Sequence, residues 1–328
     1  MTTHRVSFRT ILLAATAALL ALPALAARRS DEALSLVPVD AAAVGVIHWN
    51  ALRASPLGAK LFSETDHLTA NGDAARFMEE ARLNPKEDVD TIVIAGSPAS
   101  KDEGQSSGLV VFEGRFDTSR LSAALVARGG VRRSTPDGEY FLLPEKSEER
   151  HGKPGAVAFA SAHLVIAGDE ASVVAALSRR SSGGADFASR TTLGRQFSRI
   201  SPDASAWALV DVKRFPMGRA SEKSTGQAGE VLAAMKSVSA VAIQATVKGD
   251  GMEVAAAGVA DDEETRQLLE DSIRGVVAMW RLAVQEKSPE AVAMLRRFKI
   301  GNDGQAVTIR GSLTGDFLRS LSEKHAGR

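Results

Sequence analysis

The sequence predicts an α+β protein of two similar halves, each an antiparallel sheet backed by helices, built from four β-β-α units. Three observations carry this prediction. At four places a strand-like run ends in glycine, an acidic or hydroxyl residue follows, and an amphipathic helix begins. Asp-Gly pairs, which tolerate the positive φ of tight turns, separate strand-like runs. Similar segments also recur about 145 residues apart.

The strand–helix junctions share one chemistry. An Asp or Thr side chain accepts hydrogen bonds from the free amides of a first helical turn, so it favours a helix start there. The four junctions run from Gly114 to Asp117, Gly168 to Asp169, Gly258 to Asp261 and Gly311 to Thr314. Hairpin turns are expected at Asp137-Gly138, Asp250-Gly251 and Asp303-Gly304.

The halves are expected at 27–185 and 186–328. Residues Val89 to Leu125 resemble Val238 to Leu269, and Ala156 to Leu177 resemble Gln305 to Leu321. A duplicated half explains both matches with one offset. Chance similarity between alanine-rich strands is the alternative.

The first 26 residues have the pattern of a signal peptide. Arg5 and Arg9 precede the apolar stretch Ile11 to Leu22, and a small-x-small site ends at Ala26. The alternative is a membrane anchor, but about 12 apolar residues are too few for a span of roughly 20. We therefore expect cleavage near Ala26 and a soluble periplasmic or secreted product.

Composition excludes several classes of function. The chain has 40 basic and 40 acidic side chains, so it lacks the charge excess that nucleic-acid binding requires. It has no cysteine, which excludes disulfides and thiolate metal sites. Aromatic residues make up 5% of the chain, which disfavours ligand stacking on a carbohydrate or single-stranded nucleic acid.

One segment matches a catalytic signature. Gly104 to Gly108 fits Gly-x-Ser-x-Gly, in which a serine nucleophile sits on a turn from strand into helix. Here the motif lies in a polar loop and runs into a strand, which favours a hairpin loop. A serine hydrolase would use Ser106 with His163 or His48. Structural histidines are the more common outcome for the last two.

No local pattern predicts a metal or cofactor. The acidic cluster Asp261 to Glu264 is expected in the first turn of a helix, where it complements the dipole. The sequence contains neither Gly-x-Gly-x-x-Gly nor a phosphate-loop lysine. The prediction is therefore a protein that is not an enzyme, with no catalytic, cofactor-binding or metal residue assigned.

Strands of the first half are apolar on both faces. The runs are Ile92 to Ile94, Leu109 to Phe112, Ala156 to Ala160 and Leu164 to Ile166. A sheet covered on one face only would alternate. The favoured interpretation is that the second face packs against the other half, and the alternatives are a partner protein or an apolar ligand.

The longest helix is expected over Asp262 to Glu286. Leu269, Ile273, Val276, Trp280 and Ala283 fall on one stripe of it. This spacing predicts a buried face, with Trp280 in the core.

A further set of short motifs carries a resemblance. Pro38 to Ala41 opens a strand, Ser55-Pro56 starts a helix, and Asp88 to Asp90 precedes another strand. In these features the chain resembles a family of exported bacterial proteins of unknown function over most of its mature length. The resemblance implies export and a repeated α+β architecture, and it brings no activity or ligand.

These observations favour an exported, soluble, non-enzymatic binding or envelope-interaction protein. One alternative is a periplasmic carrier of an apolar ligand. A serine hydrolase using Ser106 is another, and an assembly factor that recognises strands at its sheet edges is a third. The expected partner is an envelope protein or an apolar ligand, without nucleic acid, cofactor or membrane span.

Overall fold

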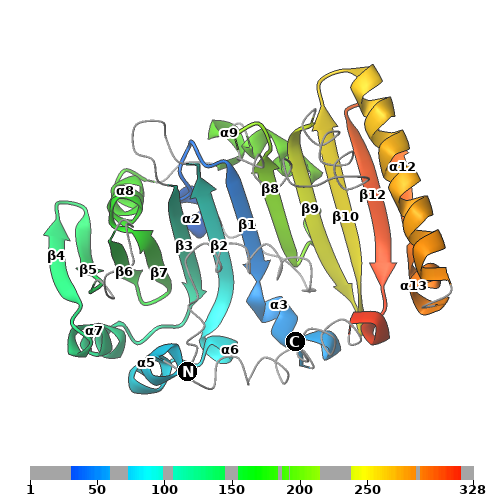
Figure 1. Cartoon of the computed structure of the whole chain (residues 1–328). Helices are drawn as coiled ribbons and strands as arrows, with labels where there is room; N and C mark the ends of the chain where they lie inside the picture. The colour runs from blue at the N-terminus through cyan, green and yellow to red at the C-terminus, as the bar shows by residue number, and fades with distance from the viewer. Residues whose placement is uncertain are drawn as a thin grey trace, which may run out of the picture.

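One antiparallel sheet of twelve strands organises the molecule (Figure 1). The structure, a computed structural model, describes residues 31–59, 73–98, 106–144, 154–183, 187–191, 193–214, 238–285 and 289–318. The predicted signal peptide lies outside these residues. The strand order is β11-β12-β10-β9-β8-β1-β2-β3-β7-β6-β5-β4. The strands are β1 (Ala43–His48), β2 (Val89–Ser97), β3 (Ser107–Gly114), β4 (Val131–Thr135), β5 (Gly138–Leu142), β6 (Gly155–Ser161), β7 (Leu164–Asp169), β8 (Ala206–Asp211), β9 (Val238–Lys248), β10 (Gly251–Ala260), β11 (Lys299–Asn302) and β12 (Ala306–Leu313).

Helices cover parts of both faces of this sheet. They are α2 (Asp31–Ser35), α3 (Trp49–Arg53), α5 (Asp73–Ala81), α6 (Pro85–Asp88), α7 (Thr118–Ala127), α8 (Glu170–Ser181), α9 (Phe187–Arg190), the 3-10 helix η1 (Gly194–Arg199), α12 (Glu263–Gln285) and α13 (Pro289–Leu295). No helix in the described part of the chain is long and apolar enough to cross a membrane. The α+β class is therefore confirmed.

The local predictions are confirmed at the hairpins and at the starts of α7 and α8, while at a third helix start the amide of Thr265 donates to Asp262 rather than to the predicted Asp261. Asp117 accepts a hydrogen bond from the Arg120 amide at the start of α7, and Asp169 accepts one from Ser172 at the start of α8. The turns at Asp137-Gly138, Asp250-Gly251 and Asp303-Gly304 join β4 to β5, β9 to β10 and β11 to β12. Short-range side-chain chemistry thus determines where these elements begin and end.

The recurring glycine has a steric cause at two of the junctions. A Cβ at Gly114 would lie 1.9 Å from the Asp88 carbonyl oxygen, and one at Gly168 would lie 2.3 Å from the Gly108 carbonyl oxygen. Both are well inside van der Waals contact. Only glycine allows the backbones to approach this closely where the strand ends.

The two halves do not form separate sheets. Strands β1 and β8 pair antiparallel in the middle, with Val46 opposite Trp207 and Val44 opposite Leu209. The expectation that one half packs face to face on the other is therefore wrong, because the halves meet edge to edge. The physical reason is that β1 and β8 each offer an unpaired backbone edge to the other.

The sheet has two apolar faces. Face A carries Val46, Val93, Val111, Ile166 and Trp207, which register pairing places on the same side. Over the first half and β8, α2, α8, α9 and η1 cover face A and form the main core. The opposite side, face B, is covered in part by α3, α5 and α7, which pack on residues such as Phe112 and Val165. The chain's own helices therefore account for much of the two-sided apolar pattern.

Helix α12 differs from its prediction. Leu269 is buried and packs with Val238 and Val307. Trp280, expected in the core, is 60% exposed. The stripe is amphipathic as predicted, but Trp280 on it does not pack on the sheet as Leu269 does.

Candidate functional site

The structure separates the residues of the predicted hydrolase. Ser106 is exposed and directly precedes β3, while Gly104 and Gln105 lie outside the described residues. His163 lies in the β6–β7 turn, with Nδ1 3.0 Å from the carbonyl oxygen of Gly114 at the other end of β3. An antiparallel strand rises about 3.4 Å per residue, so roughly 24 Å separate the two ends of β3. Ser106 and His163 are therefore too far apart to act together, and the hypothesis of this catalytic pair is wrong.

His48 is also far from Ser106. It is opposite Thr91, which is opposite Glu113, so it lies at the same end of the sheet as His163. Its side chain is 3% exposed, and burial lowers its pKa to about 4. His48 is thus a neutral, buried histidine near pH 7, and it lies at the opposite end of β3 from Ser106.

A hollow of about 450 Å³ lies on face A over the second half of the sheet. We call it the groove. Its floor is the side of β9, β10 and β12 that continues face A, and its walls are η1 and the β11–β12 turn. The floor residues that share this side are Ala242, Gln244, Ala255, Ala257, Val259, Thr308 and Arg310.

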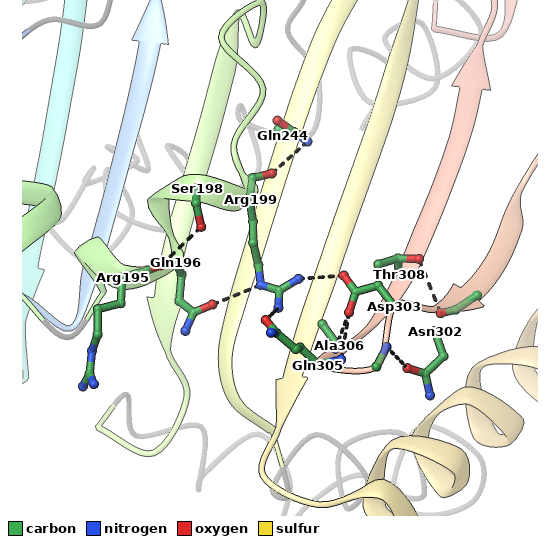
Figure 2. Close-up of polar contacts among 12 residues, drawn as sticks. Arg195, Gln196, Ser198, Arg199, Gln244, Asn302, Asp303, Gln305, Ala306 and Thr308 are labelled. Atoms are coloured by element: carbon green, nitrogen blue, oxygen red, sulfur yellow. Dashed lines mark hydrogen bonds and ion pairs between the residues drawn. The ribbon is translucent and has the colours of Figure 1, made fainter.

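Arg199 joins the two walls of the groove (Figure 2). Its guanidinium donates to Asp303 Oδ2 at 2.8 Å and to Gln305 Oε1 at 3.0 Å, both in the β11–β12 turn. Its Nε donates to Gln196 Oε1 at 3.1 Å within η1. The side chain is 15% exposed, so these bonds hold η1 against the turn with little solvent competition.

The floor contributes to the same network. Gln244 Nε2 donates to the Arg199 carbonyl oxygen at 3.4 Å, and Gln244 Oε1 accepts from the Ser201 amide at 2.6 Å. Figure 2 shows Gln244 reaching from β9 toward the end of η1. The position of η1 is therefore fixed from the sheet as well as from the turn.

Asp303 is held as a carboxylate. Burial by itself would raise its pKa, but amide hydrogen bonds from Gln305 and Ala306 and the Arg199 guanidinium together lower that pKa below its usual value. The amide bonds are 3.0 and 2.7 Å long. Asp303 is consequently ionised near neutral pH and bonded to Arg199.

Two arginines lie at the rim of the groove. Arg195 on η1 and Arg310 on β12 are exposed, and neither guanidinium has an ion-pair partner in the described part of the chain. In Figure 2, Arg195 points away from the Arg199 network. The side chains of Ala242, Ala255 and Ala257 are small, so they leave space above the floor of the groove. The arrangement offers bidentate donors beside an open floor, which is the chemistry of carboxylate or phosphate recognition.

The groove offers little for catalysis. Its ionisable lining residues are three arginines and the already bonded Asp303, and its hydroxyls are Ser198 and Thr308. None of them has a histidine beside it in that lining. Within the described ranges, no three His, Cys, Asp or Glu side chains lie close enough together to hold a metal ion.

No local pattern in the sequence predicts the groove. Arg199 and Asp303 are 104 positions apart, and the sequence predicts Asp303 only as a turn residue. The small floor residues of β10, in the run Ala255 to Ala257, were the one available signal. Such a run on a strand indicates either close packing or an open surface.

No family model matches the chain, and no curated protein sequence matches it. The structure is similar to crystal structures of TP0453. Crystal form III gives a TM-score of 0.50 at 10% identity, over 88% of this chain and 97% of that chain. Forms IV and I give TM-scores of 0.49 and 0.46 at 10% and 11% identity, each over 88% of this chain and 96% of that chain. At these identities the likeness concerns the fold alone.

Proposed function

We propose that this chain is an exported, non-enzymatic binding protein that takes a small anionic ligand in the groove. One observation carries the proposal: among the described residues, the guanidiniums of Arg195 and Arg310 have no ion-pair partner, and they lie at the rim of a hollow whose wall is held by Arg199 and Asp303. The ligand class is a compound with several carboxylate or phosphate groups.

The size and stiffness of the groove support a small ligand. Its volume of about 450 Å³ falls in the range of small-molecule sites, about 300 to 1,000 Å³. Because Gln196, Gln244 and Gln305 all bond to Arg199, the wall is preorganised and binding costs little ordering entropy. The exposed arginines then supply the attraction and the geometry.

A thermal-shift assay on the mature protein tests this function, with citrate and inorganic phosphate as probes. Both are expected to raise the melting temperature by several degrees, since a ligand that binds only the folded state stabilises it. Arg310→Ala should remove most of the shift. Arg133→Ala, an exposed arginine on the edge strand β4, is the matched control and should keep it. An unshifted wild type, or an unaltered shift in Arg310→Ala, would refute the proposal.

The proposed export is supported by the predicted signal peptide alone. The basic start, the apolar stretch and the small-x-small site at Ala26 favour secretion into the periplasm or beyond. Mass spectrometry of protein from a periplasmic fraction is expected to give a chain that begins near Ala27. An intact leader in that fraction would contradict cleavage.

We also propose that the halves are a duplication. Outward from the centre, the order is β1-β2-β3-β7-β6 on one side and β8-β9-β10-β12-β11 on the other. In each series the helix that follows the third strand is α7 or α12. The first half adds the hairpin β4–β5. This correspondence supports the division at 185/186 and the four hairpin–helix units.

A second candidate function is the carriage of an apolar ligand on face B. It is favoured by a row of half-buried apolar side chains across the middle strands, at Ile94, Val110, Val210, Ile243 and Ile309. Native mass spectrometry without detergent distinguishes the two. Added mass that organic extraction removes would favour the apolar ligand over the anion.

A further inference from the structure

Helix α12 exposes a continuous apolar surface. Leu268, Trp280 and Leu282 are 63%, 60% and 69% exposed. With the partly buried residues between them they fall within an arc of about 160° at 3.6 residues per turn. No charged side chain lies in this arc from Thr265 to Leu282. We call this surface the α12 flank, and its members are Leu268, Ser272, Gly275, Val276, Met279, Trp280 and Leu282.

Contacts near both ends hold α12 in place. The helix is anchored near its start by Leu269 and Ile273, which pack with Val238 and Val307. Near its end, Arg281 Nη2 donates to the Leu295 carbonyl oxygen of α13 at 2.8 Å. Trp280 lies on the same stripe as Leu269 and Ile273 but stays outside this packing, as do Leu268 and Leu282. An exposed tryptophan among aliphatic side chains is typical of a binding hot spot.

Charge along α12 identifies what fits the flank. From Glu263 to Asp271 the helix has four acids and one arginine, and from Ser272 to Gln285 it has two arginines and no acid. Glu264 and Asp271 have no ion-pair partner within the described residues. Arg296 and Arg297, just after α13, are likewise exposed and unpaired there. An antiparallel copy of the same helix places each acidic end against a basic end.

We propose that the chain forms a twofold homodimer through antiparallel contact of two α12 flanks. Such an interface is self-complementary, as twofold symmetry requires. The axis falls near Gly275 and Val276. A Cβ at Gly275 would have nothing within 4 Å, so the helices meet there without obstruction. Trp280 of each copy then packs between Leu268 and Ser272 of the other copy.

Analytical ultracentrifugation of the mature protein over a range of concentrations tests the dimer. The wild type is expected to change from monomer to dimer as concentration rises. Trp280→Glu should weaken association at least 10-fold, whereas Ala278→Glu, which adds the same charge on the outer side of α12, should leave it nearly unchanged. Neither side chain is buried, so both variants should fold. A wild type that stays monomeric would overturn the proposal.

Cross-linking gives a second readout. The chain has no cysteine, so single cysteines report one site each. Val276→Cys should give a covalent dimer with a short bis-maleimide, and Ala278→Cys should not. Equal cross-linking of the two would refute the antiparallel arrangement. Binding of wild type, but not Trp280→Glu, to phosphatidylglycerol vesicles without dimer formation would assign the flank to a membrane surface instead.

Discussion

Face A is filled over the first half of the sheet and β8, and open over β10 and β12. In the first half it carries Val111 and Ile166, both 0% exposed beneath α2 and α8. In the second half the same face carries Ala255, Thr308 and Arg310 at the groove. Large apolar side chains provide the area that holds helices on a sheet, while small and charged ones do not. One continuous face therefore forms the core over one region and, in the proposed function, the binding surface over the other.

The largest effect on stability is expected when a buried side chain in the filled region is truncated. Ile166→Ala should lower the free energy of unfolding by about 4 kcal/mol, because it removes a fully buried side chain and leaves a cavity. Thr308→Ala in the groove should lower it by about 1 kcal/mol or less, since only one long hydrogen bond, from the hydroxyl to the Gly301 carbonyl oxygen, is lost. Urea unfolding measures both. Similar losses at the two positions would mean that the groove is packed like the core.

The next largest effect is expected in how stability depends on pH, through a histidine of the filled region. The pKa of buried His48 is about 4, against 6.5 for the unfolded chain, so only the unfolded chain takes up this proton between those values. Stability should therefore fall by about 3 kcal/mol as the pH drops from 6.5 to 4. His48→Gln should remove that part of the slope in urea titrations. An unaltered slope would place the titrating group elsewhere.

A smaller effect is expected at the wall of the groove. Asp303→Asn should cost at most about 1 kcal/mol, because the side chain of Asp303 is 44% exposed and solvent screens its ion pair. Its lowered pKa means that this stabilisation is complete above about pH 4, the unfolded value, and is lost as the pH falls through the folded value. Hydrogen exchange at the Gln305 and Ala306 amides should quicken in the variant. Unchanged exchange would show that Arg199 does not order the turn.

The smallest effect on stability should come from filling the groove. Ala255→Leu places a larger side chain over open floor and should change stability by less than about 0.5 kcal/mol while abolishing citrate binding. Ala158→Leu, at a 0% exposed position of face A, should cost about 1 to 3 kcal/mol through overpacking. Thermal melts with and without citrate report both quantities. Retained binding in Ala255→Leu would move the site off the floor.

Local features of the fold were predictable from sequence, and long-range ones were not. Asp117, Asp169 and the Asp-Gly turns act within three residues, so their chemistry is visible in the sequence. The pairing of Val46 with Trp207 joins positions 161 apart, and nothing local specifies which edges meet. The stripe around Trp280 showed an amphipathic helix, but periodicity does not tell how far the sheet extends beneath it.

The site was less predictable than the fold. The motif from Gly104 to Gly108 is a short pattern that is easy to find in a sequence. A serine nucleophile of this kind sits on a turn from strand into helix, whereas Ser106 directly precedes strand β3. The groove has no such pattern. Arg199, Gln244 and Asp303 come from three separate elements, and only the assembled sheet brings them together.

Isothermal titration calorimetry with citrate at low salt tests the groove most directly. The wild type and Arg133→Ala should bind with the same affinity and a stoichiometry near one per chain. Arg310→Ala should bind roughly 10-fold or more weakly, since a charge-assisted hydrogen bond is worth about 1.5 kcal/mol or more. Equal affinity in all three proteins, or no heat in the wild type, would contradict an anion site in the groove.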